Sequence, residues 1–588
     1  MNGPTVTTDS GTSDERADAV VDRIEQADRS EVWIDRVART DLAAAFARMD
    51  RRRAAGDHLP LAGLTFAVKD NIDVAGVPTT AGCPAYAYRP AVSAPAVEAL
   101  IEAGAVYVGK TNLDQFATGL VGTRSPYGAV RNAVDPQRIS GGSSSGSAVA
   151  VALGLVDLAL GTDTAGSGRV PAALNGIVGI KPTRGMVSTT GVVPACGSFD
   201  CVSVFTATLD LARTVTAVIA ADDTTDPRRR PPPDDAPLGP PDRPVVACAT
   251  WNDLPDLDEG RRRAYAAALA RLSAGGCEVA PVDLGPFLEA GLLLYEGGFL
   301  AERYAAVGAW VDAHLDDVDP VVGPIIAGAG NIDASRLAAD TDLLAMLARQ
   351  AAALLTDVGA CSLALPTVPF HPTLAEVAAD PIDTNARLGR YTTFVNLLDL
   401  CAVSVPADPV DGLPFGITLI GPAWSDMVQA DLADLAALGG AASRPRTGTP
   451  PALPGLRSFP LAVAGAHLFG QPLNHQLTDR GGRLSRTTTT APFYRLVALA
   501  TDPPKPGLVR VAAGQGATVE VEVWDLPPAG MGSFLAALPL PMMLGPVTLA
   551  DGSVVTGFGC ESVALDGAAD ITAFGGWRAY LASDGEPA

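Results

Sequence analysis

Histidine and lysine are both scarce in this 588-residue sequence, which contains five histidines and only the lysines Lys69, Lys110, Lys181 and Lys505. Arginine therefore supplies most of the 42 basic side chains, which face 65 acidic ones and leave a formal net charge of -23. Nucleic acids and anionic membranes attract basic surfaces, so this balance argues against either as a partner. A chain so poor in histidine also has few candidates for the general base that serine hydrolases commonly use.

Metal-binding and export patterns are missing as well. The eight cysteines are dispersed, without a C-x-x-C pair or a neighbouring histidine that would complete a zinc site. We therefore expect buried free thiols and no metal. The longest apolar run is interrupted by Asp157, short of the roughly 18 residues that a membrane span requires. The polar, acidic N-terminus does not resemble a secretion signal, so we expect a cytoplasmic protein.

What is present indicates a large globular α/β protein. Hydrophobic residues make up 48% of the chain, and its length exceeds one ordinary core, so at least two domains are expected. Residues 1–55 have a charged, helical pattern, and residues 56–440 alternate short apolar runs with helical stretches. Residues 441–458 have the composition of a linker, and 459–588 alternate as a small β-rich domain. The proline-rich segment 222–244 is predicted to be a surface loop within the α/β domain.

Two glycine-serine clusters stand out within the stretch "ISGGSSSGSAVAVALGLVDLALGTDTAGSGRVPAALNGIVGIKPT". The first matches the G-x-S-x-G nucleophile elbow, but that motif needs a distant histidine and is weak by itself. A phosphate-binding loop is excluded because no Gly-Lys-Ser/Thr follows the glycines. A buried lysine can replace histidine as the base, because burial disfavours its charged form. Lys69 ends the apolar run "LTFAV" and is the candidate, although a surface or salt-bridging lysine fits the same position.

These stretches, with "AVKDNIDVAG" and "GLPFGITLIG", resemble the amidase signature family over roughly residues 20–440. The resemblance implies a mixed central β-sheet covered by helices and a Ser-cisSer-Lys triad. Ser167 would be the nucleophile, Ser143 the bridging serine after a cis peptide bond, and Lys69 the base. No metal or organic cofactor is implied.

The same resemblance implies an oxyanion hole made by backbone N–H groups around the nucleophile. Its candidates are the amides of Thr164, Ala165 and Gly166, together with that of Ser167. Glycines in this stretch let backbone segments approach one another closely and free their N–H groups to point inward. Such donors stabilise the developing negative charge of the transition state.

Two features are similar to allophanate hydrolases among the amidases. The second cluster reads "AGSGR", and "LLLYEGGFLAERYAAV" places Tyr295 and Arg303 where those enzymes grip a substrate carboxylate. A guanidinium can hold a carboxylate through two parallel hydrogen bonds. Eight helical residues make about two turns, so both side chains are expected on one side of a helix. Gly119 is a further candidate for a backbone contact with substrate, and an ordinary surface arginine is the alternative for Arg303.

Residues 459–588 resemble the extra domain of allophanate hydrolases, which is linked to breakdown of the released N-carboxycarbamate. Its two histidines, His467 and His475, are candidates for an acid or base, with a packing role as the alternative. The resemblance implies a homodimer that deaminates the small molecule allophanate in urea or cyanuric acid nitrogen metabolism. A broad-specificity amidase, the amidase component of a tRNA-dependent amidotransferase and a catalytically silent binding scaffold remain as alternatives.

Overall fold

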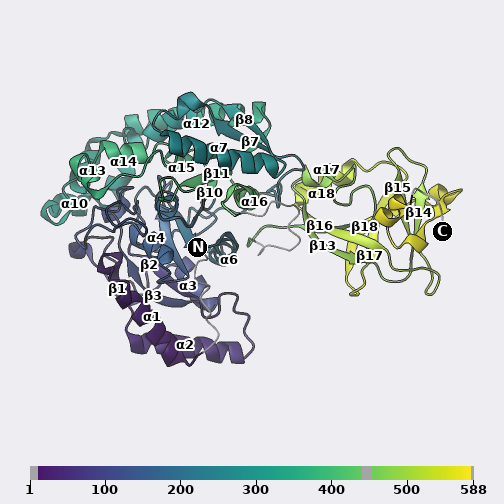
Figure 1. The fold of residues 1–588 in the computed structure, drawn as a ribbon, viewed down its shortest axis with the longest axis horizontal. Helices are drawn as coiled ribbons and strands as arrows, with labels where there is room; N and C mark the ends of the chain where they lie inside the picture. Colours follow the sequence, from purple (N-terminus) through teal and green to yellow (C-terminus); the bar gives the residue numbers. More distant parts are fainter. Residues whose placement is uncertain (1–10, 440–452, 584–588) are drawn as a thin grey trace. The chain divides into compact units, whose positions relative to one another are not determined.

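The computed structural model describes residues 11–439 and 453–583 (Figure 1). Chain contacts divide it into two units. The first is drawn from Met1–Pro231 and Val245–Ala442, and the second from Pro232–Pro244 and Ser443–Ala588. Most of the predicted linker at 441–458 falls on residues 440–452, which lie outside the described residues.

The first unit is built on an 11-stranded sheet with the strand order β1-β3-β2-β4-β6-β5-β10-β11-β9-β7-β8. It is a mixed sheet, because β2 pairs in parallel with β3 and β4 whereas β4, β5 and β6 pair in antiparallel fashion. The strands are β1 (Trp33–Arg36), β2 (Thr65–Lys69), β3 (Val106–Thr111), β4 (Leu158–Asp163), β5 (Val178–Lys181), β6 (Cys201–Thr206), β7 (Val245–Ala249), β8 (Glu278–Val282), β9 (Ala360–Pro366), β10 (Leu400–Pro406) and β11 (Gly416–Pro422).

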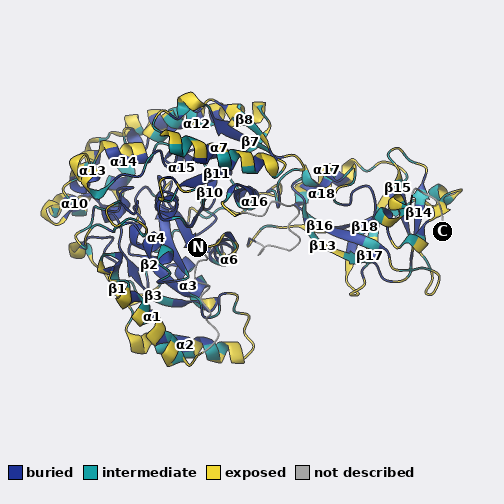
Figure 2. Cartoon of the chain, viewed as in Figure 1, coloured by how far each residue is buried: buried dark blue, intermediate teal, exposed yellow. Residues whose placement is uncertain are grey.

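Helices cover this sheet, and their outer faces are exposed while the central strands are buried (Figure 2). The mixed sheet with its helical cover confirms the predicted fold class. The helices of this unit are α1 (Ser13–Gln26), α2 (Arg39–Ala54), α3 (Pro95–Glu102), α4 (Ser145–Ala152), α5 (Val170–Asn175), α6 (Leu209–Ile219), α7 (Glu259–Ala274), α8 (Gly285–Leu292), α9 (Ala301–Arg303), α10 (Ala309–Ala313), α11 (Val322–Gly328), α12 (Ala334–Asp357), α13 (Leu374–Ala379), α14 (Asp383–Leu388), α15 (Phe394–Leu397) and α16 (Asp426–Ala436).

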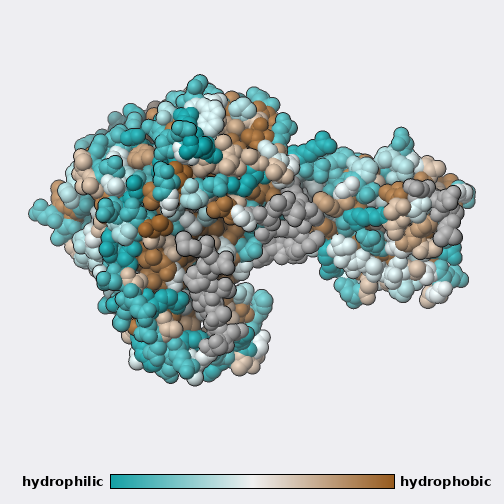
Figure 3. Space-filling view, in the orientation of Figure 1, coloured by the Kyte–Doolittle hydropathy of each residue, from teal (hydrophilic) through white to brown (hydrophobic). Residues whose placement is uncertain are grey.

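The N-terminal segment combines two amphipathic helices with a strand that the sequence pattern did not predict. A capping box starts α1: the Thr12 hydroxyl accepts the N–H of Glu15, whose carboxylate accepts the N–H of Thr12. Hydrophilic side chains cover α1 and α2 on the face seen in Figure 3. Between these helices, β1 pairs with β3 at the edge of the large sheet. Residues 11–55 are therefore an integral part of the first unit.

Helix α4 lies at the centre of the first unit. It begins in the first glycine-serine cluster, and all but its last residue are buried. It packs against β2, β3, β4 and β6, so its whole circumference meets protein. A helix that is apolar all round belongs in such a place. The apolar run between the two clusters thus forms α4 and β4. Helix α4 holds the end of the first cluster, and β4 leads into the second.

The second unit holds a five-stranded sheet, ordered β13-β16-β12-β18-β17, and a three-stranded sheet, ordered β15-β14-β19. This confirms the expected β-rich character. Its strands are β12 (Phe459–Val463), β13 (Arg483–Thr489), β14 (Tyr494–Leu499), β15 (Lys505–Arg510), β16 (Glu520–Leu526), β17 (Met542–Thr548), β18 (Val554–Cys560) and β19 (Ala569–Asp570), and its helices are α17 (His475–Thr478), α18 (Pro528–Ala536) and α19 (Trp577–Ala582).

One part of the proline-rich segment corrects the sequence prediction. Residues Pro232–Pro244 come between α6 and β7 of the first unit in the chain, yet they belong to the second unit. The N–H of Leu238 donates to the carbonyl of Gly481 at 2.9 Å, and the N–H of Ala529 donates to the carbonyl of Asp234 at 2.9 Å. These residues are therefore not a loop of the α/β domain. Proline-rich backbone with few donors can still be held through the carbonyl and amide groups that remain.

Candidate active site

Two neighbouring parallel strands lead to the predicted base and nucleophile. Lys69 is the last residue of β2, and Ser167 lies in the loop between β4 and α5. Because β2 and β4 pair in parallel, their carboxyl ends lie at the same edge of the sheet. Ser143 comes just before α4, which packs against both strands. The topology therefore brings the ends of all three segments to one edge of the sheet.

Lys69 makes two short hydrogen-bonding contacts. Its Nζ lies 2.7 Å from Ser143 Oγ and 2.7 Å from Thr162 Oγ1. All three residues are buried, and the Lys69 side chain is completely so. The predicted partners Lys69 and Ser143 are thus in direct contact, away from solvent. Thr162, in β4, was not singled out from the sequence.

The surroundings of Lys69 favour its neutral form. Burial lowers the pKa of Lys69 from 10.5 to about 7, since a charged ammonium loses its hydration there. The charges of Asp114, Asp200 and Asp163 oppose this and raise the pKa, whereas that of Arg303 adds to the lowering. With a pKa of about 7, a large fraction of Lys69 is a free amine at neutral pH, with a lone pair that can accept a proton.

Backbone crowding around Ser143 explains the glycine before it. The peptide bond between Gly142 and Ser143 is cis. A Cβ atom at position 142 would lie 2.1 Å from Asp114 Oδ2 and 2.6 Å from the nitrogen of Gly122. Asp114 also donates its own N–H to the Ser143 carbonyl at 3.2 Å and accepts the N–H of Gly122 at 3.0 Å. Only glycine fits such a close approach of backbone to backbone.

The loop that carries Ser167 is held by a buried ion pair. Asp163 accepts the N–H groups of Gly166 and Gly168, each at 3.0 Å, on either side of Ser167. Arg169 donates two hydrogen bonds to the same carboxylate, at 2.9 and 2.8 Å. Although burial alone would raise it, the Arg169 charge keeps the pKa of Asp163 below its ordinary value. The loop that carries Ser167 is therefore held by an ionised carboxylate.

The amides around Ser167 are not equivalent. The N–H of Gly166 is engaged by Asp163, whereas those of Thr164, Ala165 and Ser167 donate to none of the described residues. The Thr164 hydroxyl donates to a buried carboxylate, that of Asp200, at 2.5 Å. The Oγ of Ser167 makes no hydrogen bond within residues 11–439 and 453–583. Of the predicted oxyanion donors, Thr164, Ala165 and Ser167 therefore have N–H groups available for a ligand.

A second cluster surrounds Arg303, which is 2% exposed. Its Nη1 donates to Thr118 Oγ1 at 2.7 Å, and its Nη2 donates to the Tyr295 hydroxyl at 3.1 Å. Gly119 follows Thr118 directly and has φ of +159°. No carboxylate of the described chain forms an ion pair with Arg303. The guanidinium therefore has no direct ion-pair partner, although its charge acts at longer range on the buried carboxyl of Asp200.

Tyr295 and Arg303 do not lie on one continuous helix, so that expectation is wrong. Helix α8 ends at Leu292, before Tyr295, and α9 ends at Arg303. Turn residues and the short 3-10 helix Gly298–Leu300 separate the two helices, and the Arg303 guanidinium lies 5.1 Å from the centre of the Tyr295 ring. The two side chains therefore meet through a turn, with the cation placed against the aromatic ring.

The two histidines of the second unit differ in environment. His467 is buried, stacks on Phe558 with ring centres 4.9 Å apart, and contacts Gln476 Oε1 through Nε2 at 3.0 Å. Burial lowers the pKa of His467 to about 4, so its ring is neutral at physiological pH. His475 is exposed, with Nδ1 2.9 Å from the carbonyl of Pro472. The structure does not bring these two rings into contact.

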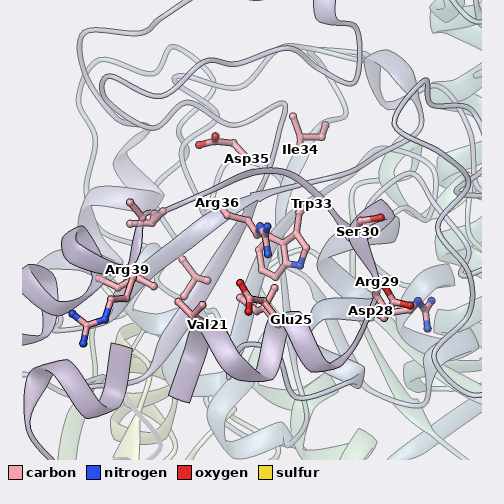
Figure 4. Close-up of a pocket in the computed structure, with 15 residues that line it drawn as sticks. Val21, Glu25, Asp28, Arg29, Ser30, Trp33, Ile34, Asp35, Arg36 and Arg39 are labelled. Atoms are coloured by element: carbon pink, nitrogen blue, oxygen red, sulfur yellow. The ribbon is translucent and has the colours of Figure 1, made fainter. Parts of the chain in front are cut away.

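Two hollows elsewhere in the first unit are not lined by the predicted site residues. One of about 790 Å³ lies beside the edge strand β1 and is lined by residues of α1, β1 and α2, among them Val21, Trp33 and Arg39 (Figure 4). None of the triad or of the Arg303 cluster lines it. Among the described residues, no three His, Cys, Asp or Glu side chains are grouped to hold a metal ion, and no helix is long and apolar enough to cross a membrane.

The sequence analysis missed several residues that hold the site. Thr162 contacts the Lys69 amine, and Asn71 contacts Thr162. Arg169 reaches from the Asp163 carboxylate to the side-chain oxygen of Asn396 at 3.0 Å. Most of these residues lie within the sequence motifs around Lys69 and Ser167. A polar residue next to a catalytic candidate is not distinguished by the sequence from one that only completes the fold. Asn396 lies in α15, far along the chain, where no local pattern connects it to the nucleophile.

Comparison with known proteins matches this geometry to a family. The Amidase family model matches residues 15–428, and the model for the allophanate hydrolase C-terminal domain matches residues 459–582. Urea amidolyase of Saccharomyces cerevisiae is 41% identical over 572 residues, which cover 93% of this chain and 31% of that protein. This chain thus spans about a third of the length of that relative.

Two further relatives illustrate the range of similar proteins. The structure of Kluyveromyces lactis allophanate hydrolase matches with a TM-score of 0.87 and 39% identity, covering 98% of this chain and 97% of that one. Amidase 1 of Oryza sativa subsp. japonica is 33% identical over 399 residues, which cover 63% of this chain and 88% of that protein. With the family model spanning most of its length and a buried lysine and serine in contact at the expected positions, this chain belongs to the amidase family.

Proposed function

We propose that this protein is an allophanate hydrolase, which deaminates allophanate to ammonia and N-carboxycarbamate by a Ser-cisSer-Lys mechanism. The 2.7 Å contact between Lys69 Nζ and Ser143 Oγ, in a buried site that lowers the pKa of the lysine to about 7, carries the proposal. It supplies a base that can act through a bridging hydroxyl, which a serine nucleophile requires. The likeness to urea amidolyase and to allophanate hydrolase supports the choice of substrate.

The reaction proceeds as acyl transfer in two halves. Lys69 accepts the hydroxyl proton of Ser143 as Ser143 accepts that of Ser167, and Ser167 Oγ attacks the terminal carbamoyl carbon. The carbonyl oxygen becomes an oxyanion, which the N–H groups of Ala165 and Ser167 can bind. The carbon–nitrogen bond then breaks, and the proton returns through Ser143 to the departing ammonia. Water repeats the sequence on the acyl-enzyme and releases N-carboxycarbamate.

The Arg303 cluster supports a substrate with a carboxylate. Allophanate ends in a carboxylate, and a buried guanidinium without a direct ion-pair partner gains from an anionic ligand. Tyr295 and Thr118 contact the two terminal nitrogens of Arg303 and hold its plane fixed. Gly119 places backbone beside this cluster without a side chain. A neutral amide lacks the charge that Arg303 would bind, which disfavours a broad-specificity amidase or the amidase component of an amidotransferase.

For the second unit, we propose a role in the breakdown of N-carboxycarbamate. His467, neutral at physiological pH, would act as an acceptor of protons rather than as an acid. His475 is exposed to solvent. Both remain candidates, and replacing each by Gln while following the conversion of N-carboxycarbamate separates them.

We further propose that the protein acts in the cytoplasm as a homodimer, without a nucleic acid partner. The net charge of -23 supports the last point, because it repels polyanions. Sedimentation of the purified chain tests the dimer, and a mass of one chain would contradict it.

Ammonia release from matched substrates tests the proposed function. Allophanate and biuret differ only in carrying a carboxylate or a carboxamide at one end, so their comparison isolates the charge. We expect rapid, Ser167-dependent release from allophanate and much slower release from biuret. Ser167→Ala should lose activity while it keeps the fold, as judged by circular dichroism. Equal rates on both substrates, or wild-type turnover by Ser167→Ala, would contradict the proposal.

A further inference from the structure

The hydroxyl of Thr162 sits between two nitrogen atoms. Thr162 Oγ1 lies 2.7 Å from Lys69 Nζ and 3.3 Å from Asn71 Nδ2. Asn71, two residues beyond Lys69 in the chain, is 1% exposed. Its other amide atom, Oδ1, is buried and has no hydrogen-bond partner among the described residues. A polar atom left unsatisfied in this way is rare enough to need an explanation.

Counting hydrogens shows a conflict in this arrangement. A threonine hydroxyl has one hydrogen to donate, and a neutral lysine amine has one lone pair to accept with. If the Asn71 amide donates to Thr162, the Thr162 hydrogen has only the Lys69 lone pair as an acceptor within the described structure. That lone pair is then occupied. Lys69 could not accept a proton from Ser143 without first breaking this hydrogen bond.

Turning the Asn71 amide by half a turn removes the conflict. The oxygen and nitrogen of an amide have nearly the same shape, so their assignment follows from the hydrogen-bond network. With Oδ1 toward Thr162, the hydroxyl donates to Asn71 and accepts an N–H of Lys69. The lone pair of Lys69 is then left facing Ser143 Oγ, 2.7 Å away.

We propose that Asn71 is a positioning residue, whose amide oxygen accepts the Thr162 hydroxyl hydrogen and thereby directs the Lys69 lone pair at Ser143. This inference rests on the proposed function only in taking Lys69 as the base. Thr162 accepts an N–H from Lys69 whether the lysine is neutral or protonated. Neither Thr162 nor Asn71 therefore has to reorient when the proton moves, which is the property of a preorganised site.

A double-mutant cycle tests the assignment, with the rate of Ser167 labelling by a fluorophosphonate probe as the readout. Asn71→Leu removes the acceptor at similar volume and should slow labelling by roughly tenfold to a hundredfold, because the competing hydrogen bond must break first. In a Thr162→Val background, Asn71→Leu should change the rate by less than about twofold, since no hydroxyl hydrogen remains to be directed. Equal losses in both backgrounds, or none in either, would overturn the proposal.

Asn71→Asp provides a second measurement that a merely structural role would not affect. Aspartate keeps the shape and the acceptor, so the labelling rate at high pH should stay near that of the wild type. Its negative charge beside Lys69 should raise the pKa of the lysine and move the acid limb of labelling to higher pH. An unmoved limb together with a slow plateau would contradict the positioning role.

The same probe separates this inference from the proposed function. Labelling of Ser167 depends on the base and not on the natural substrate, so a wild type that is labelled but inactive on allophanate would refute only the function. A wild type that is not labelled at Ser167 would overturn both. Urea unfolding of each variant checks that a slow rate does not reflect a lost fold.

Discussion

The strongest prediction concerns the pH dependence of the reaction. Lys69 must be neutral to act as a base, and burial lowers its pKa from 10.5 to about 7. At pH 7 about half of the molecules then hold a free amine, compared with roughly 1 in 3,000 for an unperturbed lysine. The fraction falls about tenfold for each pH unit below 7, to about 1% at pH 5. Activity should therefore decline in acid with that slope and level off above about pH 8.

The assay is kcat/KM for ammonia release from allophanate between pH 5 and 9, because this quantity follows the ionisation of the free enzyme. Two buried histidines do not interfere, since burial lowers the pKa of both His371 and His467 to about 4. His58 lies on an exposed loop, and His58→Gln should leave the acid limb in place. With His314→Gln and His475→Gln as the matching controls for the remaining two histidines, a limb that stays near pH 7 is assigned to the lysine.

A flat profile from pH 8 down to pH 5 would refute the reasoning, because a lysine base cannot stay neutral in acid. So would an acid limb near pH 10, which would show that burial does not perturb Lys69. The carboxylates of Asp114, Asp163 and Asp200 act to raise the pKa of Lys69. An acid limb somewhat above pH 7 would mean that these carboxylates offset more of the effect of burial on the pKa of Lys69.

Three further predictions concern Arg303, the loop that carries Ser167 and the glycine before Ser143. Arg303→Ala should lower kcat/KM for allophanate by about 100-fold, the worth of a charge-assisted pair, while that for biuret changes little; equal losses would discard this role of Arg303. Arg169→Met should lower the free energy of unfolding in urea by about 3–5 kcal/mol, because it leaves the buried Asp163 charge unpaired, and a loss below about 1 kcal/mol would contradict this. Gly142→Ala should abolish Ser167 labelling, because its Cβ would lie 2.1 Å from Asp114 Oδ2; labelling at the wild-type rate would show that the backbone can yield there.

The sequence was informative where a local pattern has one physical outcome. Strand β2 follows from the apolar run "LTFAV", and its last residue, Lys69, was predicted to lie where burial can lower its pKa. The charged, amphipathic pattern near the N-terminus likewise predicted α1 and α2. In both cases neighbouring residues determine the structure, through hydrophobic periodicity and capping.

Long-range contacts were the main source of error and omission. Tyr295 and Arg303 meet through a turn between α8 and α9, which an eight-residue spacing cannot distinguish from a continuous helix. Residues Pro232–Pro244 belong to the second unit because their amides and carbonyls find partners near positions 481 and 529. No local pattern specifies a partner more than two hundred residues away.

By itself, the sequence determined the residue types available for chemistry and the mixed α/β and β-rich character of the two units. Hydrophobic periodicity and the order of the glycine-serine motifs are properties of the chain alone. Only the tertiary structure decided the hydrogen-bond partners and the pKa values of those groups. Parallel pairing of β2 with β4 brings Thr162 to both the Lys69 amine and the Asn71 amide, and burial at that junction lowers the pKa of Lys69. Desolvation and hydrogen-bond direction depend on every neighbour in space, whatever its position in the chain.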